Sequence, residues 1–200
     1  MTVSNKLTLG DISDLRAYER ERHALRSKVI AMKQRRRIAL GTIITVSFEN
    51  RDTMRYQIQE MARVEKLITD EEIQVELDIY NALVPDPATL CATLFIELTS
   101  DESIREWLPR LVGIERSIVF HLGDGSTVRS RPEAQHEQQL TRTDTTSAVH
   151  YLVFSFEASQ MASFASGPVV LGIDHPSYSE TADLLDSTVQ ELLGDLLAVS

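Results

Sequence analysis

The chain has 200 residues, of which 42% are hydrophobic, and its formal net charge at pH 7 is −10. This content predicts one compact domain over residues 1–200, and the single cysteine, Cys91, excludes an intramolecular disulfide and a cysteine-rich zinc site. No signal-peptide-like start and no apolar run approaching the roughly 20 residues of a membrane span is visible, so we expect a soluble, cytoplasmic protein without a membrane partner.

Basic and acidic residues are segregated along the chain. Lys and Arg are concentrated between Arg16 and Arg37, whereas neither follows Arg142 and acidic residues continue to Asp195. The basic segment could bind nucleic acid, or the two ends of the chain could neutralise each other in the fold. The acidic remainder favours neutralisation, so we expect no nucleic-acid partner.

The first predicted helix opens at Asp11 or Ser13. Its apolar residues recur at three- and four-residue spacings: Ile12, Leu15, Tyr18, Leu25, Val29 and Met32. Arg22 lies in the same stripe, so it either pairs with a carboxylate or extends its head group to water. Residues 37–48 then alternate between two faces and predict one strand.

The next predicted helix carries an unusual density of hydrogen-bonding side chains. Asn50 is its expected N-cap, and its apolar stripe contains Met54, Ile58, Met61 and Ile68, with Glu65 in the middle. Two alternatives are open: a buried polar network, in which Glu65 pairs with Arg22, or a binding surface. The candidate binding residues are Asn50, Arg51, Gln57 and Glu60.

The remaining elements alternate between helices and strands. They are a helix from Asp70 to Pro85, a strand over 90–98, a helix over 100–111, a strand over 116–122 with a hairpin at 123–125, a surface loop at about 130–147, strands over 148–157 and 169–173, and a helix from Ser179 or Glu180. This order predicts an α+β fold. Its sheet should be largely antiparallel or mixed, with amphipathic helices packed on one face and long first and last helices. The core should contain Leu94, Ile96, Phe154 and Leu171.

No phosphate-binding loop, nucleophile elbow or zinc-protease motif is present. Four polar residues on or near the predicted strands could converge on a divalent metal or act in acid–base chemistry: Glu97, His121, Glu157 and His175. The same residue types are ordinary on the solvated face of an antiparallel sheet, and that interpretation is favoured. Cys91 is expected to be a small core residue rather than a nucleophile.

Several longer motifs carry a family resemblance. They are Lys6-Leu7-Thr8-Leu9, Phe48-Glu49-Asn50-Arg51, Tyr56-Gln57-Ile58-Gln59-Glu60-Met61, Leu111-Val112-Gly113-Ile114-Glu115, Thr146-Ser147-Ala148-Val149-His150-Tyr151 and Asp174-His175-Pro176. With these motifs the chain resembles a bacterial family catalogued as domain of unknown function 3501. Members tend to be encoded near rubrerythrin-like di-iron proteins and iron–sulfur oxidoreductases, which implies an accessory role in redox or peroxide metabolism. The resemblance assigns no catalytic residue.

The sequence therefore leaves two hypotheses. The first is an accessory or interaction protein with a redox protein as partner and no cofactor of its own. The alternative is a metal-binding protein or enzyme that uses the polar sheet face, including Glu97, His121 and Glu157.

Overall fold

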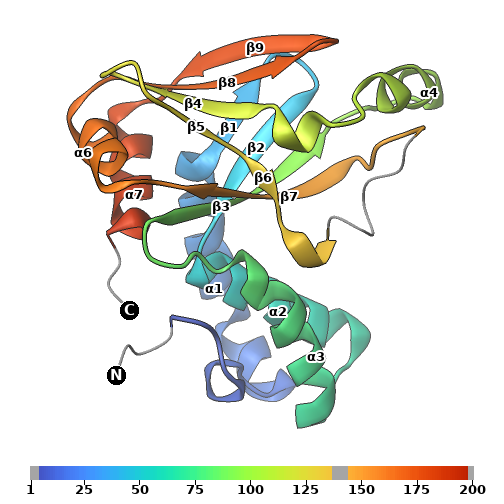
Figure 1. Cartoon of the computed structure of the whole chain (residues 1–200). Coiled ribbons are helices and arrows are strands. Elements are labelled where there is room, and N and C mark those ends of the chain that lie inside the picture. The colour runs from blue at the N-terminus through green and yellow to red at the C-terminus, as the bar shows by residue number, and fades with distance from the viewer. Residues whose placement is uncertain (1–4, 137–143, 198–200) are drawn as a thin grey trace.

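The computed structural model describes residues 5–136 and 144–197, and it contains two β-sheets beside a layer of helices (Figure 1). The helices are η1 (Leu9–Asp11), α1 (Leu15–Arg36), α2 (Arg51–Glu65), α3 (Asp70–Tyr80), η2 (Asn81–Leu83), α4 (Asp101–Arg110), η3 (Ile114–Arg116), α6 (Ala158–Ser166) and α7 (Asp186–Leu196). The strands are β1 (Arg37–Leu40), β2 (Ile44–Glu49), β3 (Thr89–Ile96), β4 (Ile118–Leu122), β5 (Thr127–Arg129), β6 (Arg131–Pro132), β7 (Val149–Ser155), β8 (Val169–His175) and β9 (Tyr178–Asp183).

The two sheets are antiparallel at each strand pair. One has the order β1-β2-β3-β7-β6 and the other the order β5-β4-β8-β9. The α+β prediction with an antiparallel arrangement is confirmed, but the strands are divided between two sheets where one was expected.

The main core lies between the two sheets, because each directs its apolar face toward the other. Phe120 of the four-stranded sheet lies 5.6 Å from Phe48 and 5.0 Å from Phe154 of the five-stranded sheet, measured between ring centroids. Phe164 of α6 and Leu192 of α7 are buried in the same cluster. The residues expected in the core are there as well: Leu94, Ile96, Phe154 and Leu171.

A second, smaller cluster lies on the other face of the five-stranded sheet. It joins α2, α3 and the N-terminal segment through Leu7, Met54, Ile58, Leu77, Leu83 and Val84, and Tyr151 of β7 packs against it. Helices α2 and α3 lie below the sheets in Figure 1. The polar face of the sheet is therefore covered by helices and is not a free solvated surface.

The strand predicted over residues 37–48 is wrong, because the chain turns at Gly41 and forms the β1–β2 hairpin. Gly41 has φ of 70°, which a glycine adopts without strain, and a Cβ there would collide with the Tyr178 hydroxyl. That hydroxyl accepts a hydrogen bond from Thr42 N at 3.1 Å and donates one to Leu40 O at 2.9 Å. Tyr178 thereby links β1 to β9, the neighbouring edges of the two sheets.

The helix predicted from Ser179 or Glu180 is also wrong over its first turns. Residues Tyr178–Asp183 form β9, which pairs with β8, and α7 begins only at Asp186. Tyr178 and Ala182 pack against the main core from this strand. Pairing along β8 overrides local helix propensity here.

Two predicted boundaries differ in the structure. Helix α1 begins at Leu15, where the Asp14 side chain accepts a hydrogen bond from Ala17 N, rather than at Asp11 or Ser13. Of the expected surface loop at about 130–147, Arg131–Pro132 form the short strand β6, and residues 137–143 lie outside the described part of the chain.

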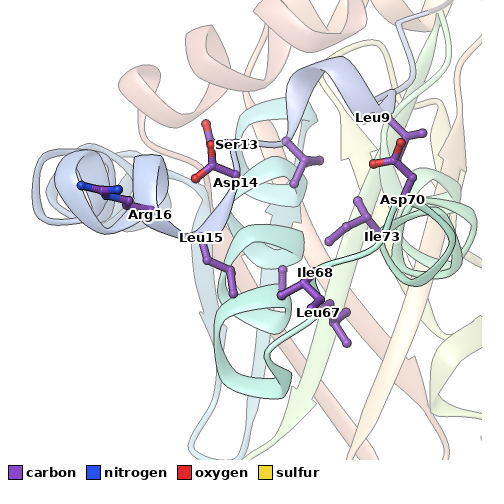
Figure 2. Close-up of a pocket in the computed structure, with 11 residues that line it drawn as sticks. Leu9, Ser13, Asp14, Leu15, Arg16, Leu67, Ile68, Asp70 and Ile73 are labelled. Atoms are coloured by element: carbon purple, nitrogen blue, oxygen red, sulfur yellow. The ribbon is translucent and has the colours of Figure 1, made fainter.

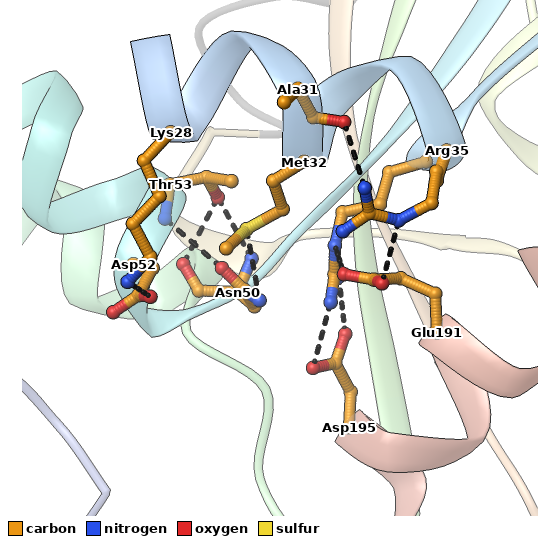
Figure 3. A network of polar contacts seen from close by, with 10 residues as sticks. Lys28, Ala31, Met32, Arg35, Asn50, Asp52, Thr53, Glu191 and Asp195 are labelled. Carbon is orange, nitrogen blue, oxygen red and sulfur yellow. Dashed lines mark hydrogen bonds and ion pairs between the residues drawn. The ribbon is translucent and has the colours of Figure 1, made fainter. Parts of the chain in front are cut away.

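The basic first helix and the acidic last helix meet at their C-terminal ends (Figure 3). Arg36 is buried and donates from Nε to Glu191 at 3.0 Å and from its two Nη atoms to Asp195. Arg35 donates to the same Glu191 at 3.1 Å. Through these ion pairs Arg35 and Arg36 neutralise part of the acidic C-terminal segment, whereas Arg22, Lys28 and Lys33 pair with Glu60, Asp52 and Glu49.

Candidate functional site

The candidate site is built around Glu49, the last residue of β2. Its side chain lies on the helix-covered face of the five-stranded sheet and is only 2% exposed. Thr93 of β3 donates a hydrogen bond from Oγ1 to Glu49 Oε1 at 3.0 Å. Lys33 Nζ of α1 lies 3.3 Å from Oε2, yet Oε2 accepts no hydrogen bond from any described residue. A buried carboxylate loses its hydrogen bonds to water, and the few donors around Glu49 replace only part of them.

Glu49 borders a cavity of about 240 Å³ between the sheet and the helical layer. Six elements and the 3₁₀ turn η2 contribute to its wall: Lys33, Glu49, Met54, Gln57, Tyr80, Leu83, Thr93, Phe95, Val149 and Tyr151. The wall combines opposite charges, neutral hydrogen-bonding groups and apolar surface. A few polar groups beside apolar surface in a concave site are typical of small-molecule sites.

The two tyrosines of the cavity wall are held in their neutral form. Burial raises the pKa of Tyr80, and this effect is larger than the opposing effect of a hydrogen bond with Gln57, which lowers the pKa. Burial also raises the pKa of Tyr151, and the nearby Tyr80 and Glu49 add to this effect. Both phenols therefore keep their protons at neutral pH and can donate hydrogen bonds.

A His–carboxylate pair lies against Tyr151. The His136 ring lies edge-on to the Tyr151 ring with centroids 4.5 Å apart, and His136 Nδ1 lies 2.6 Å from Glu133 Oε2. Burial is the largest single influence on Glu133 and opposes its ionisation, but the hydrogen bonds from the His136 side chain and from the backbone of Gln135 and His136 together lower the pKa of that carboxyl group. Glu133 N also donates to Tyr151 O at 2.8 Å, so this pair fixes the position of the tyrosine.

Of the four residues expected to bind a ligand or partner, Gln57 alone is in the cavity wall. Asn50 is the predicted N-cap of α2, and its side chain accepts a hydrogen bond from Thr53 N at 3.0 Å (Figure 3). Arg51 donates to Asn5 O at 3.1 Å and to Asp11 at 2.6 Å. Glu60 accepts from Tyr18, Arg22 and Arg63. Arg51 thus ties α2 to the N-terminal segment and Glu60 ties it to α1, whereas Asn50 caps the helix.

The predicted pair between Arg22 and Glu65 is wrong, because Arg22 binds Glu60 and Glu65 is exposed. Glu65 follows Glu60 by five residues, which places it about 140° away around the helix. Helix α2 then ends at Glu65, and Lys66 adopts φ of 58°. Ile68 therefore leaves the predicted apolar stripe and is 81% exposed.

The four candidate metal ligands belong to different surroundings. Glu97 pairs with Arg37 and accepts from Thr45, whereas His121 is exposed on the other sheet. Glu157 is the exposed N-cap of α6, and the buried His175 is 3.0 Å from Val112 O through Nε2. Within residues 5–136 and 144–197, no three His, Cys, Asp or Glu side chains lie where they could hold a metal ion.

A second hollow, on the surface, lies where the start of α1 meets the α2–α3 corner. Figure 2 shows Leu15, Leu67, Ile68 and Ile73 projecting into it, with the acidic Asp14 and Asp70 beside them. Its volume is about 310 Å³. Apolar side chains make up much of its lining, beside Asp14, Arg16 and Asp70, and it contains none of the residues that were expected to bind.

Sequence reasoning missed Glu49, Lys33, Tyr80 and Tyr151 as site residues. The available signal was the alternation in β2 and β3, which places Thr45, Ser47, Thr93 and Phe95 on one face together with Glu49. A carboxylate at the end of a strand's polar face is a buried-site candidate only once a helical layer is known to cover that face.

Comparison with known proteins gives a family but no activity. The family model described as "Protein of unknown function (DUF3501)" matches residues 6–196. A crystal structure of a novel protein of unknown function from Burkholderia pseudomallei K96243 is 36% identical, with a TM-score of 0.87 over 96% of this chain and 99% of that chain. A search of curated proteins finds no match. No helix of the described residues is long and apolar enough to cross a membrane.

Proposed function

The chain belongs to the DUF3501 family of proteins of unknown function, and from the Glu49 cavity we propose that it is an accessory protein that binds a small polar ligand. The observation that carries this proposal is the incompletely paired carboxylate of Glu49 in the wall of a cavity of about 240 Å³. Buried carboxylates without a full set of donors are unfavourable for folding, so a ligand that supplies a donor gains binding energy there.

The rest of the wall supports selective binding. Tyr80, Tyr151 and Gln57 offer hydrogen bonds at the cavity wall, since the two tyrosines are half-buried and neutral. Apolar side chains on the sheet and helices, among them Phe95 and Met54, would contact the body of the ligand.

The cavity can be tested by filling it. Val149→Phe adds volume at the cavity wall, and Val75→Phe makes the same change at an exposed position of α3 as the matched control. Small cations, anions, zwitterions and neutral polyols are each added at millimolar concentration, and the melting temperature is measured. At least one class should raise the melting temperature of the wild type and the control, but not of Val149→Phe. Equal responses of all three proteins in every class would refute the proposal.

The redox link implied by the family resemblance is a further part of this proposal. Cys91 is buried, and burial raises the pKa of its thiol to about 12, which makes it a poor nucleophile. The accessory role would therefore act through a redox partner, with the apolar hollow at Ile68 as the contact surface.

This part can be tested with purified proteins. Binding of a rubrerythrin-like protein is measured by calorimetry for the wild type and for Ile68→Asp, with Val75→Asp as the control at another exposed apolar position. Binding should be lost in Ile68→Asp and kept in the control. No binding by the wild type would remove the redox link and leave the ligand cavity unaffected.

A further inference from the structure

Resting on the proposed ligand cavity, we infer that its ligand is a small zwitterion, an α-amino acid with a short apolar side chain. The cavity wall carries two opposite charges, a negative one on Glu49 and a positive one on Lys33. Glu49 is 2% exposed and lies inside, whereas the side chain of Lys33 is 34% exposed and lies toward solvent. The site therefore has a negative inner end and a positive outer end.

The unmet hydrogen-bonding capacity differs at the two ends. Glu49 Oε2 accepts no hydrogen bond from the part of the chain that the structure describes, so the inner end needs a donor. Lys33 Nζ has three protons. Among the described residues its contacts are with Glu49, whose Oε2 and Oε1 lie 3.3 and 3.4 Å away. The outer end can therefore still donate to a carboxylate. An ammonium group beside Glu49 and a carboxylate beside Lys33 would meet both needs.

Charge balance excludes simpler ions as the preferred ligand. Glu49 and Lys33 together are neutral, so a simple cation would leave an unbalanced positive charge near Lys33. A simple anion would leave an unbalanced negative charge near the buried Glu49. A zwitterion keeps the cavity neutral, and its two charges lie antiparallel to the Lys33–Glu49 pair.

The remaining wall fits the other parts of an amino acid. The rings of Tyr80, Tyr151 and Phe95 provide electron-rich faces that favour an ammonium group. Met54, Leu83 and Val149 supply apolar contacts for a short side chain. The volume of about 240 Å³ limits the ligand to a small molecule.

The test compares zwitterions with analogues that lack one charge. The probes are alanine, valine and methionine, the amine isobutylamine, the acid isovalerate and the neutral isovaleramide, each titrated into the purified protein by calorimetry. One of the amino acids should bind at least about tenfold more tightly than the amine or the acid, because each analogue loses one charge-assisted contact.

Two variants assign the contacts. Glu49→Gln should weaken amino-acid binding and leave isovalerate unchanged, and Lys33→Gln should weaken amino-acid binding and leave isobutylamine unchanged. Glu97→Gln, on the same sheet face but outside the cavity, is the control. The probe series on the wild type gives an answer even if one variant fails to fold.

The failures are distinguishable. The zwitterion proposal is overturned if one of the analogues binds as tightly as the best amino acid and Val149→Phe blocks that binding. The analogues are isobutylamine, isovalerate and isovaleramide. The proposed ligand cavity would stand in that case. If no probe of any charge class binds the wild type more tightly than it binds Val149→Phe, the zwitterion proposal and the ligand cavity are both overturned.

Discussion

Glu60 of α2 accepts two hydrogen bonds from Arg22 of α1, from Nε to Oε1 at 2.7 Å and from Nη2 to Oε2 at 2.9 Å. The Tyr18 hydroxyl adds a third at 2.6 Å. This bidentate contact fixes how α1 and α2 cross, and it identifies Glu60 as a structural residue of the described fold.

Glu60→Gln should destabilise the protein by about 1–3 kcal/mol, as expected for loss of hydrogen bonds to a charged group. Glu65→Gln, at an exposed position of the same helix, should change stability by less than about 0.5 kcal/mol. Urea unfolding of both variants measures the difference. Equal losses of unfolding free energy in Glu60→Gln and Glu65→Gln would mean that the Arg22–Glu60 contact does not stabilise the protein.

The same contact predicts a dependence on pH. The hydrogen bond from Arg22 lowers the pKa of Glu60 from 4.5 to about 2. Because the folded pKa is below the unfolded value, the stabilisation by Glu60 is present above pH 4.5 and is lost as the pH falls toward 2. The stability gap between wild type and Glu60→Gln should therefore narrow between pH 6 and pH 3, and a constant gap would contradict the assignment.

Arg36 should be the most sensitive basic residue of the first helix. Its side chain is 3% exposed, and Arg36→Met would leave Glu191 and Asp195 without their buried partner. A loss of about 3–5 kcal/mol is expected for breaking a buried ion pair. Arg35→Met is the control, because Arg35 is 48% exposed and should cost about 0–1 kcal/mol. Chemical denaturation of both variants would reveal whether burial decides the cost.

Glu49 should behave in the opposite way to Arg36. Glu49→Gln removes a charge that is incompletely paired, and Lys33 is exposed enough to turn toward water. We expect the stability without ligand to change by less than about 1 kcal/mol, since replacing a poorly compensated buried charge is often neutral. A loss above about 3 kcal/mol in urea unfolding would show that Glu49 holds the fold and is not kept for a ligand.

Cys91 should be inert in the native protein. It is 3% exposed, and burial raises its pKa to about 12. Labelling by an aromatic disulfide reagent should therefore be slow in buffer and fast in urea. A Ser155→Cys, Cys91→Ser double variant, with its thiol at an exposed position, should label at once in buffer. Rapid labelling of the wild type would place Cys91 at a reactive surface.

Local patterns in the sequence predicted much of the fold. The cap at Asn50 depends on nearest neighbours, and so does the hairpin at residues 123–125, which the structure places between β4 and β5. The core positions Leu94 and Phe154 follow from strand alternation. These features require no knowledge of distant partners.

The features that were missed depend on contacts between distant parts of the chain. The turn at Gly41 is fixed by Tyr178, more than a hundred residues later, and β9 exists because β8 pairs with it. The cavity joins elements from Lys33 to Tyr151. From the sequence, Glu60 and Glu65 of α2 were both possible partners of Arg22, and only the crossing of the two helices selects Glu60.

The Tyr178 bridge also bears on how separate copies of the protein meet. Strands β1 and β9 are the edges of their sheets, and unpaired backbone groups on such edges can add a strand from another molecule. The Tyr178 hydroxyl bonds Leu40 O and Thr42 N, so a side chain of β9 covers one end of the β1 edge. One hydroxyl group thereby makes two backbone groups at this edge unavailable to a strand of another molecule.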